Sequence, residues 1–149
     1  MNDESLRMME LAMQGFQCSQ ILLQFALEAG GKQDPDLIRA MGGLAAGLGC
    51  GKACGALTGG CCLLGLYAGK GTSESQPDER LGEMLRRFVE WFELEFTSRY
   101  GGIDCSDILG EDPRNKIMRC PGVVLESLQQ LRSILKGSGF EFTGESKSE

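Results

Sequence analysis

Residues 47–62 read GLGCGKACGALTGGCC, and this stretch decides the fold. From position 53 to position 68 the sequence is apolar on every side of a helix, which is typical of a helix buried in the centre of a domain. Glycines lower helix propensity, but they also let neighbouring backbones approach closely. We therefore predict a glycine-rich turn over 47–51, followed by a buried central helix.

A membrane span is the alternative for this apolar run. Lys52 is the single charge between Met41 and Gly69. The uninterrupted part, residues 53–69, is at the short end of the roughly 17–25 residues that a spanning helix needs. Since the other predicted helices are amphipathic and charged on one side, we expect a buried helix and no membrane insertion.

The rest of the chain has the apolar periodicity of helices, and no strand pattern competes with it. Asp34-Pro35 is typical of a helix start, and a polar linker occupies residues 70–77. We predict an all-α, compact multi-helix bundle in residues 1–136 and a disordered tail over 137–149. The expected helices around the central one cover residues 3–15, 19–29, 36–46, 78–99, a short segment after Cys105, and 121–136.

Inward-facing stripes follow from the same periodicity. In the first helix the stripe is Leu6, Met9 and Met13. In the long helix it is the set Leu81, Leu85, Phe88, Phe92 and Phe96, and in the last helix it is the set Val124, Leu128, Leu131 and Leu135.

The overall charge excludes several classes of partner. The net charge is −6 and the isoelectric point is about 4.8, whereas nucleic-acid binding needs clustered Lys and Arg. The N-terminal sequence has acidic residues where a signal peptide has basic ones. We expect a cytoplasmic protein whose thiols are kept reduced and which binds no nucleic acid.

The cysteines are the main chemical groups of the chain. There are seven of them and no histidine, which excludes Ser-His and Cys-His catalytic pairs and mixed Cys/His zinc sites. In a reduced compartment such a number favours metal or redox chemistry over structural bridges.

Four cysteines lie at or beside predicted helix N-termini: Cys18, Cys54, Cys105 and Cys120. Free backbone N–H groups and the helix dipole stabilise a thiolate at such positions. Thiolate is the form that binds metals and attacks disulfides, so these four are the candidate site residues.

The other three cysteines are less clear from the sequence. Cys61 and Cys62 lie in the middle of the central helix, where a cysteine usually packs as a small apolar side chain. Cys50 lies in the glycine-rich turn close to Cys54, and it is a further candidate ligand.

Together these elements resemble a known redox-active family, named for its C…GCAxxG…C…C pattern. Residues 54–59 are similar to its Cys-Gly-Ala-x-x-Gly element. Cys18 in FQCSQILLQF, Cys105 in IDCSDILG and Cys120 in RCPGVVLESL resemble the other family cysteines, so that the resemblance extends from about residue 18 to residue 136. It implies redox activity, or binding of a metal or iron–sulfur centre, through those four cysteines.

Three functions remain open at this point. Four thiolates without histidine suit an iron–sulfur cluster, or zinc in a structural or sensing role. A thiol–disulfide redox protein without any cofactor is the second reading, with Lys52 assisting Cys54. A non-catalytic helical interaction module is the third.

The segment FVEWFELEF around Trp91 is either ordinary core or part of a homodimer interface. A redox role also requires a redox partner, which the sequence does not identify.

Overall fold

The computed structural model describes residues 3–142 and confirms the all-α prediction, because this part of the chain contains no strand. Its seven α-helices are α1 (Asp3–Met13), α2 (Cys18–Ala29), α3 (Pro35–Met41), α4 (Gly55–Ala68), α5 (Leu81–Tyr100), α6 (Cys105–Leu109) and α7 (Asn115–Gly137). The third helix is shorter than predicted, since a single 3₁₀ turn, Gly42–Leu44, follows α3.

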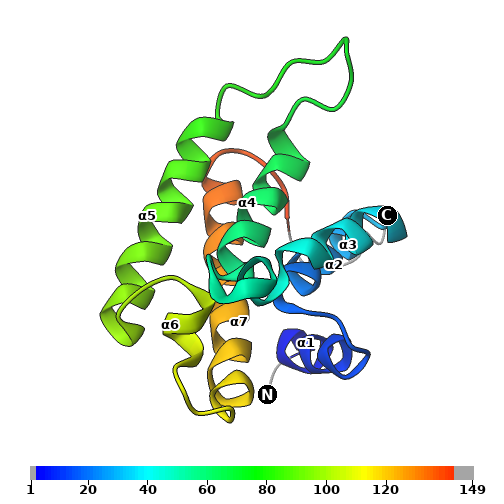
Figure 1. Cartoon of the computed structure of the whole chain (residues 1–149). Helices are drawn as coiled ribbons and strands as arrows, with labels where there is room; N and C mark the ends of the chain where they lie inside the picture. The colour runs from blue at the N-terminus through cyan, green and yellow to red at the C-terminus, as the bar shows by residue number, and fades with distance from the viewer. Residues whose placement is uncertain (1–2, 143–149) are drawn as a thin grey trace.

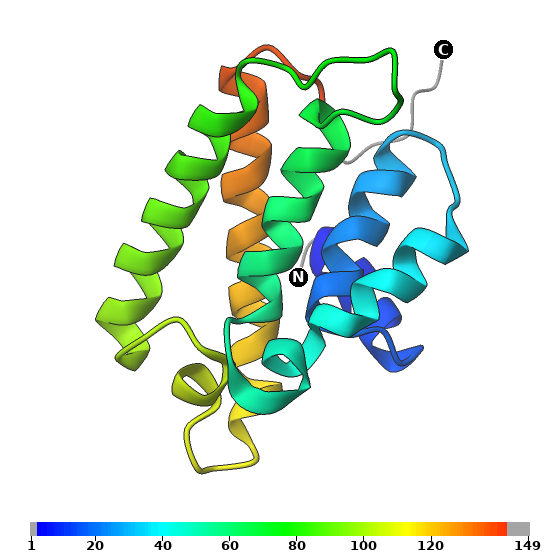
Figure 2. The same ribbon diagram turned by 45° about the horizontal axis from the view of Figure 1, so that its top comes forward.

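The central helix is α4, as the sequence predicts. It packs against α2, α5 and α7, and Figures 1 and 2 show these four helices side by side. In Figure 2 the N-terminal ends of α2 and α4 and the first turns of α7 lie at the same end of the bundle, next to α6.

Glycines allow α4 to approach its neighbours closely, which confirms the role predicted for them. A Cβ atom on Gly59 would lie 2.8 Å from the Cα of Ser19 in α2, and one on Gly60 would collide with the ring of Phe88 in α5. The Ser19 hydroxyl is fully buried and donates a hydrogen bond of 2.8 Å to the carbonyl of Met41. Backbone contact thus joins α2, α3 and α4 without an unsatisfied hydroxyl.

Aromatic side chains of α5 and leucines of α7 fill the other half of the core. Phe88, Phe92 and Phe96 are fully buried, and the ring centroids of Phe92 and Phe96 are 4.6 Å apart. Trp91 is half-buried beside them. The phenylalanines are therefore ordinary core, while a homodimer stays a prediction.

Helix α7 begins earlier than predicted. The sequence Cys120-Pro121 suggested a helix start, but Pro121 lies inside α7, which begins at Asn115. Tertiary contacts explain the difference. The side chains of Asn115 and Arg119 each donate a hydrogen bond to a carbonyl group of α6, with a donor–acceptor distance of 2.8 Å in both cases. These bonds stabilise the part of α7 that precedes Pro121, where a proline by itself disfavours helical backbone.

Helix α1 turns a different face inward from the predicted one. Met8 and Leu11 are buried, whereas the predicted stripe is exposed, with Met13 at 85%. Ion pairs account for this rotation, since Arg7 pairs with Glu28 of α2 and Glu4 pairs with Arg132 of α7.

The residues after α7 fold back onto the bundle. Phe140 and Phe142 both contact the ring of Tyr67, and Phe142 is buried. These residues belong to the predicted tail over 137–149. Residues 143–149 lie outside the described residues.

The apolar central helix does not form a membrane span. It has 14 residues, and among residues 3–142 no helix is both long enough and apolar enough to cross a bilayer.

The core assignment predicts a sharp contrast between two positions of α5. Phe92→Ala should lower the free energy of unfolding by about 3–5 kcal/mol, because it leaves a cavity in the core. Leu94→Ala, at a side chain that is 78% exposed, should change it by less than about 0.5 kcal/mol. Urea denaturation followed by circular dichroism measures both, and similar losses from both variants would contradict the assignment.

Candidate functional site

A short antiparallel contact between two distant segments brings Cys54 and Cys105 together. The N–H of Cys54 donates a hydrogen bond to the carbonyl of Ile103, with an N···O distance of 3.0 Å. The N–H of Cys105 donates one to the carbonyl of Lys52, with an N···O distance of 2.6 Å. Ala53 lies opposite Asp104 in this contact. Side chains alternate along extended backbone, so the two cysteines project to the same face of this contact. They are diagonal neighbours, whose Cα atoms are typically about 7–8 Å apart.

Cys54 caps the N-terminus of α4 rather than lying in its first turn. The N–H groups of Ala56 and Leu57 face its sulfur, although neither forms a regular capping hydrogen bond. The cysteine is buried, with 8% of its surface exposed. Its thiol is therefore the innermost of the four candidates.

Cys18 is the first residue of α2, and its sulfur lies directly against α4. A Cβ atom on Gly55 would be only 2.5 Å from the Cys18 Sγ. The N–H groups of Ser19 and Ala46 act on the same sulfur. The missing side chain at Gly55 thus makes the room that Cys18 occupies beside Cys54.

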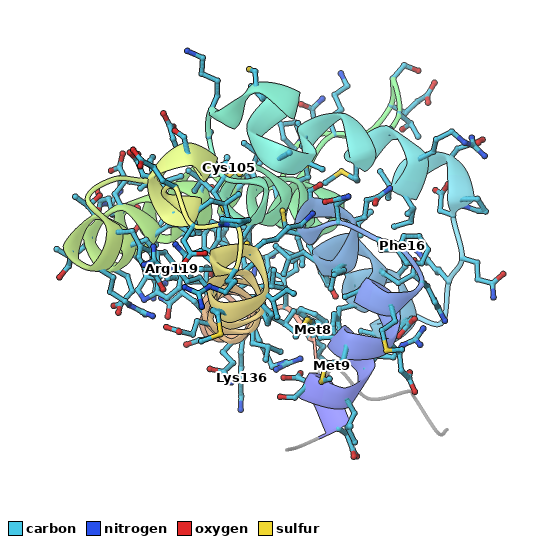
Figure 3. The ribbon with its side chains drawn as sticks, turned by 60° about the horizontal axis from the view of Figure 1, so that its bottom comes forward. Met8, Met9, Phe16, Cys105, Arg119 and Lys136 are labelled. Carbon is cyan, nitrogen blue, oxygen red and sulfur yellow. The ribbon has the colours of Figure 1, made fainter. Side chains whose placement is uncertain are left out.

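Cys105 and Cys120 come from the junction of α6 and α7. Cys105 is the first residue of α6, and Gly47 packs on it so closely that a Cβ there would lie 2.8 Å from the Cys105 Cβ. Cys120 lies in the second turn of α7, so the prediction that it stands at a helix N-terminus is wrong. Figure 3 views the bundle from this end and shows Cys105 on α6 and Arg119, the neighbour of Cys120, on α7.

The four thiols are close enough to influence one another's charge. Cys18 and Cys120 each interact electrostatically with the other three members of the set. Segments that are far apart in the sequence therefore bring these four thiols within reach of one another's charge.

Burial outweighs the helix ends in setting the protonation of these thiols. Loss of solvent raises the pKa of Cys54 to about 12 and the pKa of Cys120 to about 11, and it also raises the pKa of Cys18 and of Cys105. Neighbouring N–H groups lower the pKa of Cys18 and of Cys54, but by less than burial raises it. The helix ends therefore favour thiolate at Cys18 and Cys54, as expected, but burial has the larger effect and keeps the thiols protonated.

All seven cysteines are free thiols. Among residues 3–142, no three cysteine, aspartate or glutamate side chains are placed to hold one metal ion as they stand.

The remaining three cysteines differ in how far they are exposed to solvent. Cys61 is half-buried against the core, as predicted, but the packing interpretation is wrong for Cys62, which is exposed. Cys50 is also exposed, and its Sγ lies 3.7 Å from the carbonyl of Gly47.

The loop that carries Cys50 has an unusual backbone. Besides its glycines, Ala46 and Leu48 adopt left-handed conformations, with φ of 56° and 62°. Such values cost a residue with a side chain about 1–2 kcal/mol. This conformation brings the Ala46 N–H to the Cys18 sulfur, a contact that sequence reasoning missed because neither residue type predicts it.

Comparison with known proteins places the chain in a family. Residues 16–134 match the family described as "Putative redox-active protein (C_GCAxxG_C_C)". The chain belongs to this family. The match covers most of the chain, all four candidate cysteines included, and supports a redox role in general terms. No curated protein and no solved structure matches the chain.

The packing of Gly55 on Cys18 predicts opposite effects of the same substitution at two glycines of α4. Gly55→Ala should destabilise the protein by about 1–3 kcal/mol, because its methyl group would displace the Cys18 sulfur. Gly65→Ala has no atom within 4 Å of the new Cβ, so it should stabilise the helix by about 0.5–1 kcal/mol. Urea unfolding of both variants checks this, and a gain in stability from Gly55→Ala would refute the close contact.

Proposed function

We propose that Cys18, Cys54, Cys105 and Cys120 form a single redox centre that binds an iron–sulfur cluster and supports electron transfer or redox sensing. The observation that carries the proposal is the approach of four thiols from α2, α4, α6 and α7 at one end of the bundle. The family's redox description points the same way.

The donor chemistry of the site fits such a cluster. Thiolate sulfur is the usual protein ligand of iron–sulfur clusters, and four cysteines complete the common ligand set. The chain has no histidine that would point to a mixed site. Glycines at positions 47 and 55 let Cys105 and Cys18 pack directly against the backbone of the neighbouring segments.

The surrounding backbone has the features that tune a bound cluster. N–H groups of Ala56 and Leu57 face the Cys54 sulfur, and those of Ser19 and Ala46 face the Cys18 sulfur. Such donors offset negative charge on ligating sulfurs and so affect the reduction potential. A bound cluster would supply one-electron transfer, while the chain would hold the sulfurs, limit solvent access and spread the charge.

The burial of these thiols favours a bound cluster over the alternative of a thiol–disulfide redox protein without a cofactor. Thiol–disulfide exchange needs a thiolate, and desolvation raises the pKa of all four thiols. A bound cation would reverse this effect, because a thiol that binds a cation releases its proton to solvent and ligates as thiolate. Zinc would use the same four ligands in a structural or sensing role.

Composition analysis and a pair of cysteine variants test the proposal. Protein purified without oxygen should absorb visible light and contain iron and acid-labile sulfide. Cys54→Ser should lose most of both, because it removes the innermost ligand. Cys62→Ser, which changes an exposed thiol on the same helix, should retain them.

Other outcomes would overturn the proposal. Colourless protein that contains stoichiometric zinc would show that the site binds structural zinc and no redox cluster. Metal-free protein that forms disulfides under oxidation would favour thiol–disulfide exchange. Equal loss of iron from both variants would contradict the choice of ligands.

A further inference from the structure

Helix α1 has a second apolar face, which points to solvent. Its inner face carries Met8 and Leu11, which are buried, whereas Leu6, Met9 and Met13 are 50%, 43% and 85% exposed. These three side chains follow one another at spacings of three and four residues, so they form a ridge along one side of the helix. A surface helix normally has a single apolar face. The α1 ridge, as we call this set of three, is therefore a candidate contact surface.

Charged side chains beside the α1 ridge are paired within their own molecule. Arg7 pairs with Glu10 and with Glu28 of α2, and Glu4 pairs with Arg132 of α7. A partner that covers the ridge would therefore not have to supply a counter-charge for these groups, because each already has one. The ridge suits an apolar partner surface.

A groove lies next to the ridge, between the turn that joins α1 to α2 and the start of α3. Its volume is about 420 Å³, and Phe16, Pro35 and Ile38 supply its apolar lining. Phe16 follows Met13 by three residues, and Figure 3 shows it where the chain passes from α1 to α2. Met13 does not cover the groove of its own chain, because it is 85% exposed.

Three of the polar side chains that line the groove are engaged in bonds of their own. Gln20 donates a hydrogen bond of 3.1 Å to the carbonyl of Ile38. Asp34 accepts a hydrogen bond from the backbone at the start of α3, and Arg39 pairs with Asp36. Since these groups already have partners, the groove suits an apolar side chain better than a small polar ligand.

We propose that the α1 ridge and this groove are the two halves of a homodimer interface, in which Met13 of each copy packs in the groove of the other. Both halves lie on one side of one chain, so a two-fold axis between them makes both contacts at once and closes the assembly. Anchors at spacings of three and four residues are typical of a helix that binds in a groove. The flexible side chain of methionine adapts to such a surface.

Charge favours this arrangement over direct pairing of two α1 helices. Helix α1 (DESLRMMELAM) has three acidic residues and one basic residue, which gives it a net charge of −2. Residues 32–39 (KQDPDLIR), at the groove, have two basic and two acidic residues and are neutral. Ridge against groove therefore avoids the repulsion that ridge against ridge would cause. The dimer goes beyond the proposed function and does not depend on the four cysteines.

The mass of the protein in solution tests the proposal, with a reductant present so that exposed cysteines cannot link two copies. Met13→Lys places a charge in the proposed contact. Leu94→Lys places the same charge on α5, at a side chain that is 78% exposed. The unchanged protein and Leu94→Lys should sediment at twice the chain mass of 16.1 kDa. Met13→Lys should raise the Kd of the dimer about thirtyfold, as loss of a central interface residue does.

Circular dichroism of the two variants is the control for folding, and both should keep the helical spectrum, because both side chains are exposed within one chain. A monomer in the unchanged protein at about 100 µM, where a dimer of micromolar Kd is detected, would overturn the proposal. The same Kd in all three proteins would also overturn it.

A photo-crosslinker locates the contact. Benzoylphenylalanine in place of Met13 should join two copies on irradiation, and peptide mass spectrometry should find the new bond in residues 16–39 of the second copy. A covalent dimer joined through α1 of both copies, or through any other segment, would contradict the groove contact. Failure to form a covalent dimer would contradict it as well.

Discussion

The fold and the site depend on one close contact, where Gly55 and Gly59, in the first two turns of α4, meet the first turn of α2 and place no side chain of their own in the contact. A Cβ on Gly55 would be 2.5 Å from the Cys18 sulfur, and a Cβ on Gly59 would be 2.8 Å from the Ser19 backbone. This contact aligns the N-terminal ends of both helices, and α7 packs against both. The glycines therefore cost helix propensity but bring cysteines from distant segments to one end of the bundle.

Two opposing effects act on those cysteines. N–H groups at the ends of α2 and α4 favour negatively charged sulfur at Cys18 and Cys54. Burial opposes them and prevails, so the thiols are held protonated when no cation is present. A group of protonated thiols, of which Cys54 is buried and the other three are half-buried, is poorly suited to nucleophilic attack. It is well suited to a soft cation, which would displace the protons and use the same N–H groups to disperse charge.

The sequence predicted those features that depend on local pattern. The all-round apolar character of residues 53–68 identified the central helix, and the absence of histidine limited the chemistry to thiols. Features that depend on tertiary contacts were not predictable. The early start of α7 depends on Asn115 and Arg119 bonding to α6, and the rotation of α1 depends on ion pairs with α2 and α7.

The central claim is that Cys18, Cys54, Cys105 and Cys120 act as one centre, while Cys50, Cys61 and Cys62 do not belong to it. Cadmium, a thiophilic ion, tests this directly without assuming the natural occupant. Reduced protein is titrated with Cd²⁺, and alkylation of each cysteine is then followed by mass spectrometry. The account predicts that the four lose reactivity together while exposed Cys50 and Cys62 remain reactive. Protection of a different set, or of no cysteine at all, would contradict it.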